Sequence, residues 1–357
     1  MEKKSVCVLF GGVSPEHEVS LRSAECVLAN LDPERWEVLP VGITRSGRWL
    51  YCPGLPPAVA ADGSWERFPD AMPAALSPAR GDGLLITLPS GERTSLHPDV
   101  VFPVLHGENG EDGSVQGLCQ LAGLPCVGPG VGASAAAMDK TMTKLAADRA
   151  GIPQAAWEPV RREELTGPSE RLEEILCRAE RRLGYPMFVK PAGTGSSVGV
   201  AKVRDRGELR DALTAAARYD SKLLIEEAIV GREVEVAIMG NEDPIASVCG
   251  EIDAGAEFYD YDAKYLTDTS RAYIPARISE ASAREAGRLA VRIFTALGCR
   301  GLSRADFFVR EDGTVIFNEI NTIPGFTSIS MFPKLFAYGG MPIPQQVTRL
   351  LELALED

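Results

Sequence analysis

A β-hairpin near the C-terminus constrains the fold of this 357-residue chain more than any other segment. Residues 304–321 read RADFFVREDGTVIFNEIN, in which two β-patterned runs flank Asp312-Gly313, a dipeptide typical of a two-residue hairpin loop. A loop of these two residues fixes the remaining pairs: Glu311 with Thr314, Asp306 with Glu319, and Arg304 with Asn321. Because successive strand side chains point to opposite faces, the four polar side chains at the open end all lie on one face of the sheet.

The polar face of this hairpin is the first candidate for a metal site. Two carboxylates directly opposite each other destabilise an ordinary sheet, but a cation that bridges Asp306 and Glu319 removes the repulsion. Together with the Asn321 amide they form an oxygen-only set that suits Mg²⁺, whose remaining ligands are usually waters and phosphate oxygens. A solvated outer face, with Arg304 paired to one carboxylate, is the alternative. The same register places two phenylalanines on that face, which argues against solvation: Phe308 and Phe317.

The composition describes a globular chain and excludes several classes of partner. Lys and Arg total 37 against 50 Asp and Glu, and the formal charge of −13 argues against a nucleic-acid binder. No apolar run approaches the ~20 residues that span a membrane, and the short run 5–10 ends at Gly11-Gly12, too early for a signal peptide. The eight cysteines show no zinc-ligand spacing, and we expect them to be reduced. We therefore expect a cytoplasmic protein of two or three domains, with no nucleic-acid and no membrane partner.

Strand and helix patterns alternate along the chain, which predicts an α/β fold. The apolar run 5–10 leads through the turn 11–15 into a helical pattern for which Ser20 is the expected N-cap. Residues 53–100 are rich in Pro, Gly and Ala with little periodicity, so we expect loops and edge strands there. The remaining patterns predict a strand at 100–105, helices at 114–122 and 134–150, a connection at 153–162, a helix at 169–183, strands at 187–190 and 198–203, a helix at 206–218, and strands at 222–227 and 233–239.

A glycine-rich segment, VKPAGTGSSVGV at 189–200, lies between two predicted strands. Its small residues leave backbone N–H groups free to approach phosphate oxygens, and its hydroxyls add donors. It is neither a Walker A loop nor a dinucleotide fingerprint, since no helix begins there. A plain Gly/Ser hairpin turn is the alternative. Lys190 is more informative, because a lysine at the end of an apolar strand needs an anion or a carboxylate as partner.

Other charged residues lie at positions suited to a nucleotide. Lys144 is part of a helical pattern, where an ordinary surface lysine is the alternative. Glu226 ends one predicted strand and Glu233 begins the next, an arrangement that suits a backbone hinge for a base and a carboxylate for ribose hydroxyls. Ordinary strand-end charges remain the alternative for both glutamates.

The motifs in their order along the chain are Lys144, VKPAGTGSSVGV, IEEAIVGREVEV and RADFFV…FNEINTIPGFTS. Three further segments accompany them: GGVSPEHEVSLRSA at 11–24, LHGENGEDGSVQG at 105–117 and EFYDYDAKY at 257–265. Together they resemble the D-alanine–D-alanine ligases of the ATP-grasp superfamily. The resemblance runs from about residue 5 to the C-terminus, and residues 53–95 and 160–180 carry little of it.

The resemblance implies a three-domain ATP-grasp architecture. An N-terminal domain with an open parallel sheet, residues 1–132, precedes two α+β domains, residues 133–222 and 223–357, that clamp ATP. The implied reaction phosphorylates the carboxylate of one D-alanine, and the amine of a second D-alanine then displaces phosphate from the acyl phosphate. ATP is the co-substrate, with two Mg²⁺ or Mn²⁺ ions. The resemblance also implies a homodimer and a part in peptidoglycan synthesis, and hence in bacterial cell-wall biogenesis and cell shape.

The resemblance carries roles onto individual residues of this chain. The implied metal ligands are Asp306, Glu319 and Asn321. The implied ATP contacts are Lys144, Lys190, Ser197, Glu226, Ile229, Glu233 and Lys264. The implied catalytic residues are Glu18, Ser196, Tyr265, Arg304 and Gly325, with Glu18 holding the first D-alanine's ammonium near His106 and Arg304 and Gly325 stabilising the oxyanion. The implied substrate contacts are His106, Ser330 and Met331.

The nearest alternatives are relatives that join D-alanine to D-lactate or D-serine. D-lactate ligases place a histidine in the segment that here spans 255–270, which holds none. Relatives that select either substrate commonly carry arginine where this chain has Met331. Both departures favour D-alanine. A non-catalytic nucleotide-binding protein is a further alternative, and it should lack one of four residues that are all present: Glu18, Arg304, Glu319 and Asn321.

Overall fold

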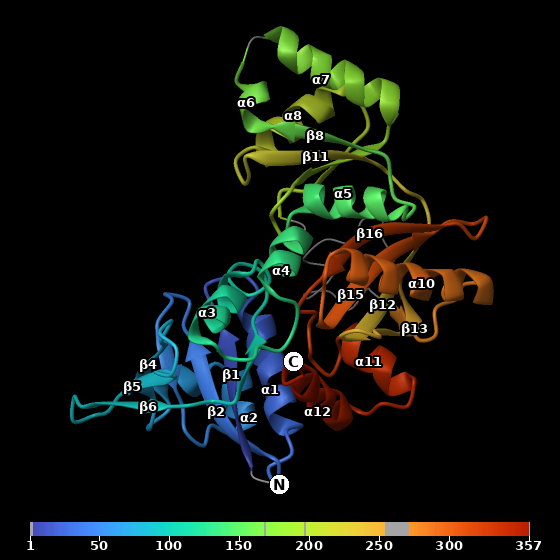
Figure 1. Cartoon of the computed structure of the whole chain (residues 1–357). Coiled ribbons are helices and arrows are strands. Elements are labelled where there is room, and N and C mark those ends of the chain that lie inside the picture. Colours follow the sequence, from blue (N-terminus) through green and yellow to red (C-terminus); the bar gives the residue numbers. More distant parts are fainter. Residues whose placement is uncertain (1–2, 168, 196–197, 254–270, 357) are drawn as a thin grey trace.

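Three β-sheets follow one another along the chain, and helices pack against each of them (Figure 1). The computed structural model describes residues 3–167, 169–195, 198–253 and 271–356. The expected α/β class is confirmed. None of the helices in the described part of the chain combines the length and the apolar character needed to cross a bilayer.

The N-terminal sheet is mixed, with seven strands in the order β6-β5-β4-β3-β2-β1-β7. Three strands run parallel: β1 (Lys4–Gly11), β2 (Trp36–Ile43) and β7 (Val100–Val104). The others extend the sheet antiparallel: β3 (Trp49–Tyr51), β4 (Met72–Leu76), β5 (Leu84–Thr87) and β6 (Arg93–Leu96). The expected parallel sheet is therefore correct only for β1, β2 and β7, because β3, β5 and β6 each follow their neighbour through a short connection, which suits antiparallel pairing. The edge strands expected within 53–100 are present, beside the short helices α2 (Pro57–Ala61) and η1 (Ser64–Arg67).

The first helix does not begin where the sequence predicts. α1 spans His17–Ala29, so Ser20 lies inside it and the expectation that Ser20 caps the helix is wrong. The buried Ser20 hydroxyl instead accepts a hydrogen bond from the Gly11 N–H at 2.8 Å and donates one to the Val104 carbonyl. Gly11 and Val104 end neighbouring parallel strands, so Ser20 ties the helix to the carboxyl edge of the sheet.

Three helices connect the N-terminal sheet to the next one. α3 (Ser114–Ala122) matches its predicted range, whereas the helix predicted at 134–150 is divided into α4 (Val131–Met138) and α5 (Lys140–Ala150). Asp139 separates them with an extended ψ of 103°, and its carboxylate accepts hydrogen bonds from backbone N–H groups in the first turn of α5. This N-cap fixes where α5 begins and hence which face its lysines occupy.

The central sheet is antiparallel and forms a separate lobe at the top of Figure 1. Its strand order is β10-β9-β11-β8, with bounds Ala201–Val203, Met187–Pro191, Lys222–Glu227 and Trp157–Arg161. The associated helices are α6 (Arg162–Leu165), α7 (Ser169–Arg182) and α8 (Arg206–Ala216). β11 pairs with both β8 and β9, so this sheet extends to residue 227, beyond the predicted domain boundary at 222.

The C-terminal sheet has five antiparallel strands in the order β14-β13-β12-β15-β16. Their bounds are Arg271–Tyr273, Ile245–Asp253, Arg232–Gly240, Gly301–Val309 and Val315–Asn321. α10 (Glu280–Ala296) covers one face, where its apolar side packs on alternate residues of β12, β15 and β16. α11 (Met331–Tyr338) and α12 (Ile343–Ala354) pack on the other face.

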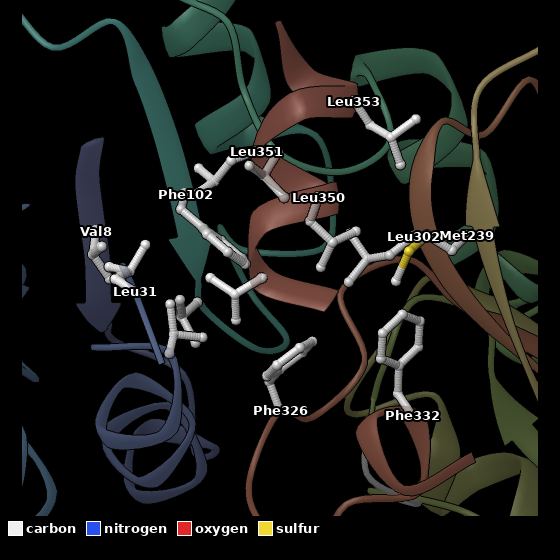
Figure 2. Close-up of a cluster of buried hydrophobic side chains, with 14 of the residues drawn as sticks. Val8, Leu31, Phe102, Met239, Leu302, Phe326, Phe332, Leu350, Leu351 and Leu353 are labelled. Atoms are coloured by element: carbon white, nitrogen blue, oxygen red, sulfur yellow. The ribbon is translucent and has the colours of Figure 1, made fainter. Parts of the chain in front are cut away.

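The N-terminal and C-terminal units share one apolar core, shown in Figure 2. Leu350 and Leu351 of α12 lie between Phe102 of β7 and Leu302 of β15 in this buried cluster. Removing these side chains from water is the main force that holds the units together. The shared core therefore fixes the carboxyl ends of β1 and β7 relative to the hairpin of β15 and β16.

The hairpin has the predicted pairing at its polar end but a different loop. Arg304 pairs with Asn321 and Asp306 with Glu319, as the sequence predicts. The Arg310 N–H donates to the Thr314 carbonyl at 2.9 Å, which leaves a three-residue loop instead of two residues. Gly313 closes this loop at φ 86°, a left-handed conformation that glycine adopts without strain.

A bulge restores the predicted register at the polar end. The pairing shifts by one residue between Asp306 and Phe307, so the altered loop is compensated before the carboxylates are reached. Phe317 consequently pairs with Phe307, and the two rings meet edge to face in the core below α10. The expectation that Phe317 shares the polar face with Phe308 is therefore wrong, because the bulge moves Phe317 to the other face.

Candidate active site

Two lysines and a glutamate form a buried ion cluster between α5 and the central sheet. Lys144 and Glu226 are 2% and 3% exposed, and the Lys144 Nζ pairs with one Glu226 oxygen. The Lys190 Nζ lies 2.5 Å from the other oxygen. Burial raises the pKa of Glu226, but the charges of the two lysines outweigh burial and lower this pKa to about 2. Lys190 thus has the carboxylate partner that its place at the end of an apolar strand requires.

Strand alternation and the start of α5 together direct Lys144, Lys190 and Glu226 to the same place. In β9, Met187 and Val189 point into the core of the central lobe, so Lys190 points to the opposite face. Lys190 pairs with Leu224 of β11, and Glu226 lies two residues further along the same face. The N-cap of α5 sets the helical phase that directs Lys144 at this face.

A small pocket beside the cluster brings predicted ATP and metal residues together. Residues from α5, β9, β11 and β16 line it, among them Lys140, Lys144, Lys190, Glu226, Asn318 and Glu319. Burial lowers the pKa of Lys190, but Glu226, Glu319 and Glu233 outweigh burial and raise it. Glu319 and Glu233 are therefore close enough to stabilise the charged lysine. A larger surface hollow between α1 and α12 contains none of the predicted residues.

Lys140 is a residue that sequence reasoning missed. It lies one helical turn before Lys144, and its Nζ donates to the Thr194 carbonyl of the glycine-rich segment at 2.7 Å. The Lys140 backbone N–H also donates to the Ala192 carbonyl at 2.9 Å. The spacing of four residues between the lysines was the available signal, since such residues share one helix face.

The glycine-rich segment connects β9 to β10, which pair as an antiparallel hairpin. The Gly193 N–H donates to the Asp220 carboxylate at 2.7 Å, and the Thr194 hydroxyl donates to the Val198 carbonyl at 2.9 Å. The hairpin alternative is thus correct for the backbone, and it leaves a role in binding phosphate open. Four predicted site residues lie outside the described residues: Ser196, Ser197, Lys264 and Tyr265.

The polar face of the C-terminal hairpin contains the predicted metal residues. Arg304 makes two hydrogen bonds of 2.7 Å to the two oxygens of Asp306, and the Asn321 amide donates to Asp306 at 3.2 Å. The pairing of Arg304 with a carboxylate is the one that the alternative interpretation anticipates. Within the described residues, no group of three or more His, Cys, Asp or Glu side chains has the arrangement of a metal site.

Glu235 of β12 adds a third carboxylate to this face, and the sequence analysis did not single it out. It lies directly across from Asp306, which in turn lies across from Glu319, so three strands align three carboxylates in one row. The Arg304 Nε lies 3.1 Å from a Glu235 oxygen. Burial lowers the pKa of Arg304, but Asp306 and Glu235 outweigh burial and keep it well above its ordinary value. The oxygen donors of this row are those that Mg²⁺ prefers.

His106 connects the N-terminal sheet to the loop that follows β16. Its Nδ1 donates to the Ile323 carbonyl at 3.0 Å, so its Nε2 accepts from the Ser23 hydroxyl at 3.1 Å. Ser23 in turn accepts from the Phe326 N–H at 3.1 Å. Burial lowers the pKa of His106, which agrees with a neutral ring that uses one nitrogen as an acceptor. The hydrogen bonds position the loop that contains Gly325.

The predicted second-substrate residues follow on this loop. A Cβ on Gly325 would lie 2.9 Å from the Ser330 hydroxyl oxygen, so a larger residue there would require the Ser330 side chain to shift. Ser330 and Thr327 bond each other through both backbone and side chain, with 2.8 Å between their hydroxyl oxygens. Met331 begins α11, and its thioether occupies the space above Gly250, where a Cβ would collide with it.

Two predicted ATP residues lie along the connection between the central and C-terminal sheets. Ile229 is half-buried in residues 228–231, the link between β11 and β12. Glu233 follows near the start of β12 and pairs with Phe308 of β15. The charge of Glu233 acts on Lys190, so the link lies beside the buried cluster.

Glu18 does not lie where the sequence analysis expects it. Its side chain is 63% exposed and pairs with Arg45 at 2.7 Å on the outer side of α1. Glu16, two residues earlier, is the one directed at the site: one of its oxygens lies 2.8 Å from the Cβ position of Gly107 and 3.5 Å from that of Gly195. Because α1 begins only at His17, Glu16 stays in the turn at the carboxyl edge of β1, and Glu18 rotates outward.

Glu111 is a further acidic group that sequence reasoning missed. Its carboxylate accepts a hydrogen bond from the Gly107 N–H at 2.9 Å. Burial raises the pKa of Glu111, and the nearby Glu16 carboxylate raises it further, to about 8. Glu111 therefore retains its proton at neutral pH.

Comparison with known proteins gives a consistent picture over the whole chain. Residues 5–129 match the family model of the D-ala D-ala ligase N-terminus, and residues 146–352 match that of the D-ala D-ala ligase C-terminus. The D-alanine--D-alanine ligase of Acetivibrio thermocellus is 47% identical over 99% of this chain and 96% of its own length.

Two solved structures have the same fold over nearly all of their length. The VanG D-Ala:D-Ser ligase from Enterococcus faecalis superimposes with a TM-score of 0.89 at 37% identity, covering 99% of this chain and 100% of that one. The D-alanine-D-alanine ligase from Coxiella burnetii gives 0.83 at 34% identity, covering 99% and 95%. With its motifs, its three sheets and its family matches in agreement, the chain belongs to the D-alanine–D-alanine ligase family.

Proposed function

We propose that this chain catalyses the reaction for which its family is named, the ATP-dependent joining of two D-alanines into D-alanyl-D-alanine. The observation that carries the proposal is the pocket in which Lys144, Lys190 and Glu319 meet. A carboxylate is a poor acyl donor, and phosphorylation gives it a good leaving group. Transfer of a phosphoryl group requires mainly positioning and neutralisation of charge, which lysines and a cation site supply.

The ATP phosphates bind to the lysines of the buried cluster. Lys190 and Lys144 already face one carboxylate, so an incoming phosphate finds two ammonium groups held in place. Lys140 holds the glycine-rich segment through its hydrogen bond to the Thr194 carbonyl. Ser197 adds a hydrogen-bond donor in the same segment. Lys264 contacts a phosphate from the segment 255–270. Ile229 and Glu233, which lie at the link between the two sheets, flank the base and ribose. Glu226 contributes to the same site from β11.

Two Mg²⁺ ions, or Mn²⁺, bind to Asp306, Glu319 and Asn321. The register supports this assignment, since Asp306 and Glu319 lie directly across from each other on neighbouring strands, an arrangement that a bridging cation stabilises. When bound, the ions neutralise charge on the transferring phosphoryl group. Arg304 and the backbone N–H near Gly325 stabilise the oxyanion that forms when the second amine attacks.

The first D-alanine binds through its ammonium to Glu16, which takes the role that the sequence analysis gave to Glu18. Glu16 is half-buried beside Gly107 and Gly195 and close to His106, whereas Glu18 is occupied by Arg45 in solvent. Ser196 and Tyr265 complete this side of the site by linking to the same glutamate. The second D-alanine binds through its carboxylate to Ser330 and Met331.

A ligase that adds D-serine is the second candidate, because the VanG D-Ala:D-Ser ligase is a structural relative. Met331 argues for D-alanine, because a buried apolar side chain packed against Gly250 stands where relatives that select D-serine commonly carry arginine. The product is made in the cytoplasm for peptidoglycan synthesis, which sustains cell shape, and the enzyme is a homodimer. The proposed domains are 1–132, 133–222 and 223–357; each contains one sheet, except that β11 of the central sheet runs on to residue 227.

Phosphate release tests the choice of substrate. Release with D-alanine alone should equal or exceed the release with D-alanine plus D-serine or D-lactate, and D-alanyl-D-alanine should be the main product by mass spectrometry. A mainly mixed product would refute the proposal. Phosphate release that does not depend on any D-amino acid would refute the ligase activity itself.

A further inference from the structure

We propose that Glu235 is a positioning residue for Arg304, an inference that rests on the oxyanion role proposed for Arg304. Glu235 lies on β12 and neither binds nucleotide nor serves as one of the proposed metal ligands. It reaches the site from a different strand than Asp306, the other partner of Arg304. Two carboxylates from two strands thus hold one guanidinium.

The contacts of Arg304 fix the orientation of its guanidinium as well as neutralise its charge. Its side chain is 18% exposed, and those of Glu235 and Asp306 are each 14% exposed. Both carboxylates engage the edge of the guanidinium that carries Nε, at 3.1 Å for Glu235 and 2.7 Å for Asp306. Because the guanidinium is planar and rigid, fixing one edge sets the direction of the other.

A second anchor is needed because Asp306 has two tasks. Arg304 uses both oxygens of Asp306, and the same oxygens are the proposed ligands of a cation. A carboxylate that binds a divalent ion gives up part of its hydrogen-bonding capacity to the arginine. Glu235 keeps Arg304 in place when the cation binds, so the guanidinium still faces the developing oxyanion.

An unpaired charge at Glu235 would carry a high desolvation cost because of the residues around it. Ala237 and Met239 follow it on the same face of β12, and both are buried in the core shared with α11 and α12. A carboxylate placed next to these buried apolar side chains costs free energy to desolvate unless it is paired. Glu251, on the neighbouring strand, pairs with Arg232 and Arg277 away from Arg304 and offers a matched control.

Steady-state kinetics with D-alanine and ATP test the proposal on the full-length enzyme. Glu235→Ala should lower kcat about 100-fold, since loss of orientation acts on the chemical step. The KM for ATP should change by less than about threefold, because the nucleotide contacts are intact. Glu235→Gln should recover only part of the loss, since its amide oxygen keeps the place of the Glu235 oxygen 3.1 Å from the Arg304 Nε but lacks the charge of the ion pair. Glu251→Gln should destabilise the same sheet and leave kcat within about twofold of the parent.

Two further measurements separate positioning from other roles. Calorimetric affinity for ADP with Mg²⁺ should be within about threefold of the parent in Glu235→Ala, and a much larger loss would make Glu235 a metal ligand and overturn the proposal. In an Arg304→Gln background, Glu235→Ala should have no further effect on kcat, because the residues act as one unit. Additive losses would overturn it.

The Arg304 variant also distinguishes two kinds of failure. If Arg304→Gln retains normal kcat, the oxyanion role itself is wrong, and the inference falls with it. If Arg304→Gln is inactive but Glu235→Ala is normal, only the positioning role of Glu235 is wrong.

Discussion

Removing the charge of Glu226 should destabilise the central lobe more than any single surface substitution. Glu226→Gln leaves Lys144 and Lys190 facing each other in a buried space without the carboxylate that pairs with both of them. A pKa lowered from 4.5 to about 2 corresponds, at 1.36 kcal/mol for each pH unit, to about 3 kcal/mol of folding free energy. Loss of one partner from a buried ion pair costs a similar amount, about 3–5 kcal/mol.

The dependence on pH follows from the sign of the change. Because the carboxyl is more acidic in the folded protein than in the unfolded chain, its contribution is fully present above pH 4.5 and is lost as the pH falls toward 2. The parent protein should therefore lose central-lobe stability across this interval. Glu226→Gln should lack that part of the acid sensitivity.

Hydrogen exchange followed by mass spectrometry measures the effect where it occurs. Peptides covering β9 and β11 should exchange faster in Glu226→Gln at pH 7, by the factor that corresponds to about 3 kcal/mol. Glu285→Gln is the matched control, since Glu285 pairs with Arg288 on the exposed side of α10 and should cost less than about 1 kcal/mol. A Glu226→Gln effect as small as this control would refute the reasoning.

Three other substitutions test separate parts of the site. Glu319→Gln should abolish ATP turnover while leaving circular dichroism and the thermal midpoint unchanged, and near-normal turnover would contradict its role as a metal ligand. Glu16→Gln should raise the KM for the first D-alanine about tenfold or more, since a charged hydrogen bond contributes about 1.5–3 kcal/mol, whereas the exposed Glu18→Gln should leave it unchanged; the reverse result would restore Glu18. Because Glu111 stays protonated up to about pH 8 in the folded protein but only to 4.5 when unfolded, stability should fall as pH rises from 4.5 to 8. Glu111→Gln should remove this fall in urea titrations, and an unchanged slope would contradict the raised pKa.

Much of the fold could be predicted because local patterns determine it. α3 and β11 have the predicted bounds, since apolar periodicity and flanking turn residues mark them. The pairing of Asp306 with Glu319 was also predictable, although the loop has three residues and a bulge restores the register. The predicted pairing is correct only because the bulge compensates for the longer loop, and neither feature could be read from the sequence.

The site was predictable only where a strand or helix fixes the direction of a side chain. Lys190 and Glu226 follow from strand alternation, and the structure brings them together. Glu16 was missed because the choice between it and Glu18 depends on where α1 begins, a position that tertiary hydrogen bonds of Ser20 decide. Ion pairs between strands far apart in the sequence could not be predicted either. The pair of Glu235 and Arg304 is an example.

The sequence by itself determined the family, the α/β class and the chemical groups of the site, because motifs and side-chain periodicity are local properties of the chain. The tertiary structure decided which of these groups meet. It selected Glu16 over Glu18, enclosed Glu226 between two lysines, and aligned Glu235 with Asp306. These outcomes depend on helix starts, bulges and the register of strands far apart in the chain. Such features minimise the free energy of the whole packed molecule, and no local segment encodes them alone.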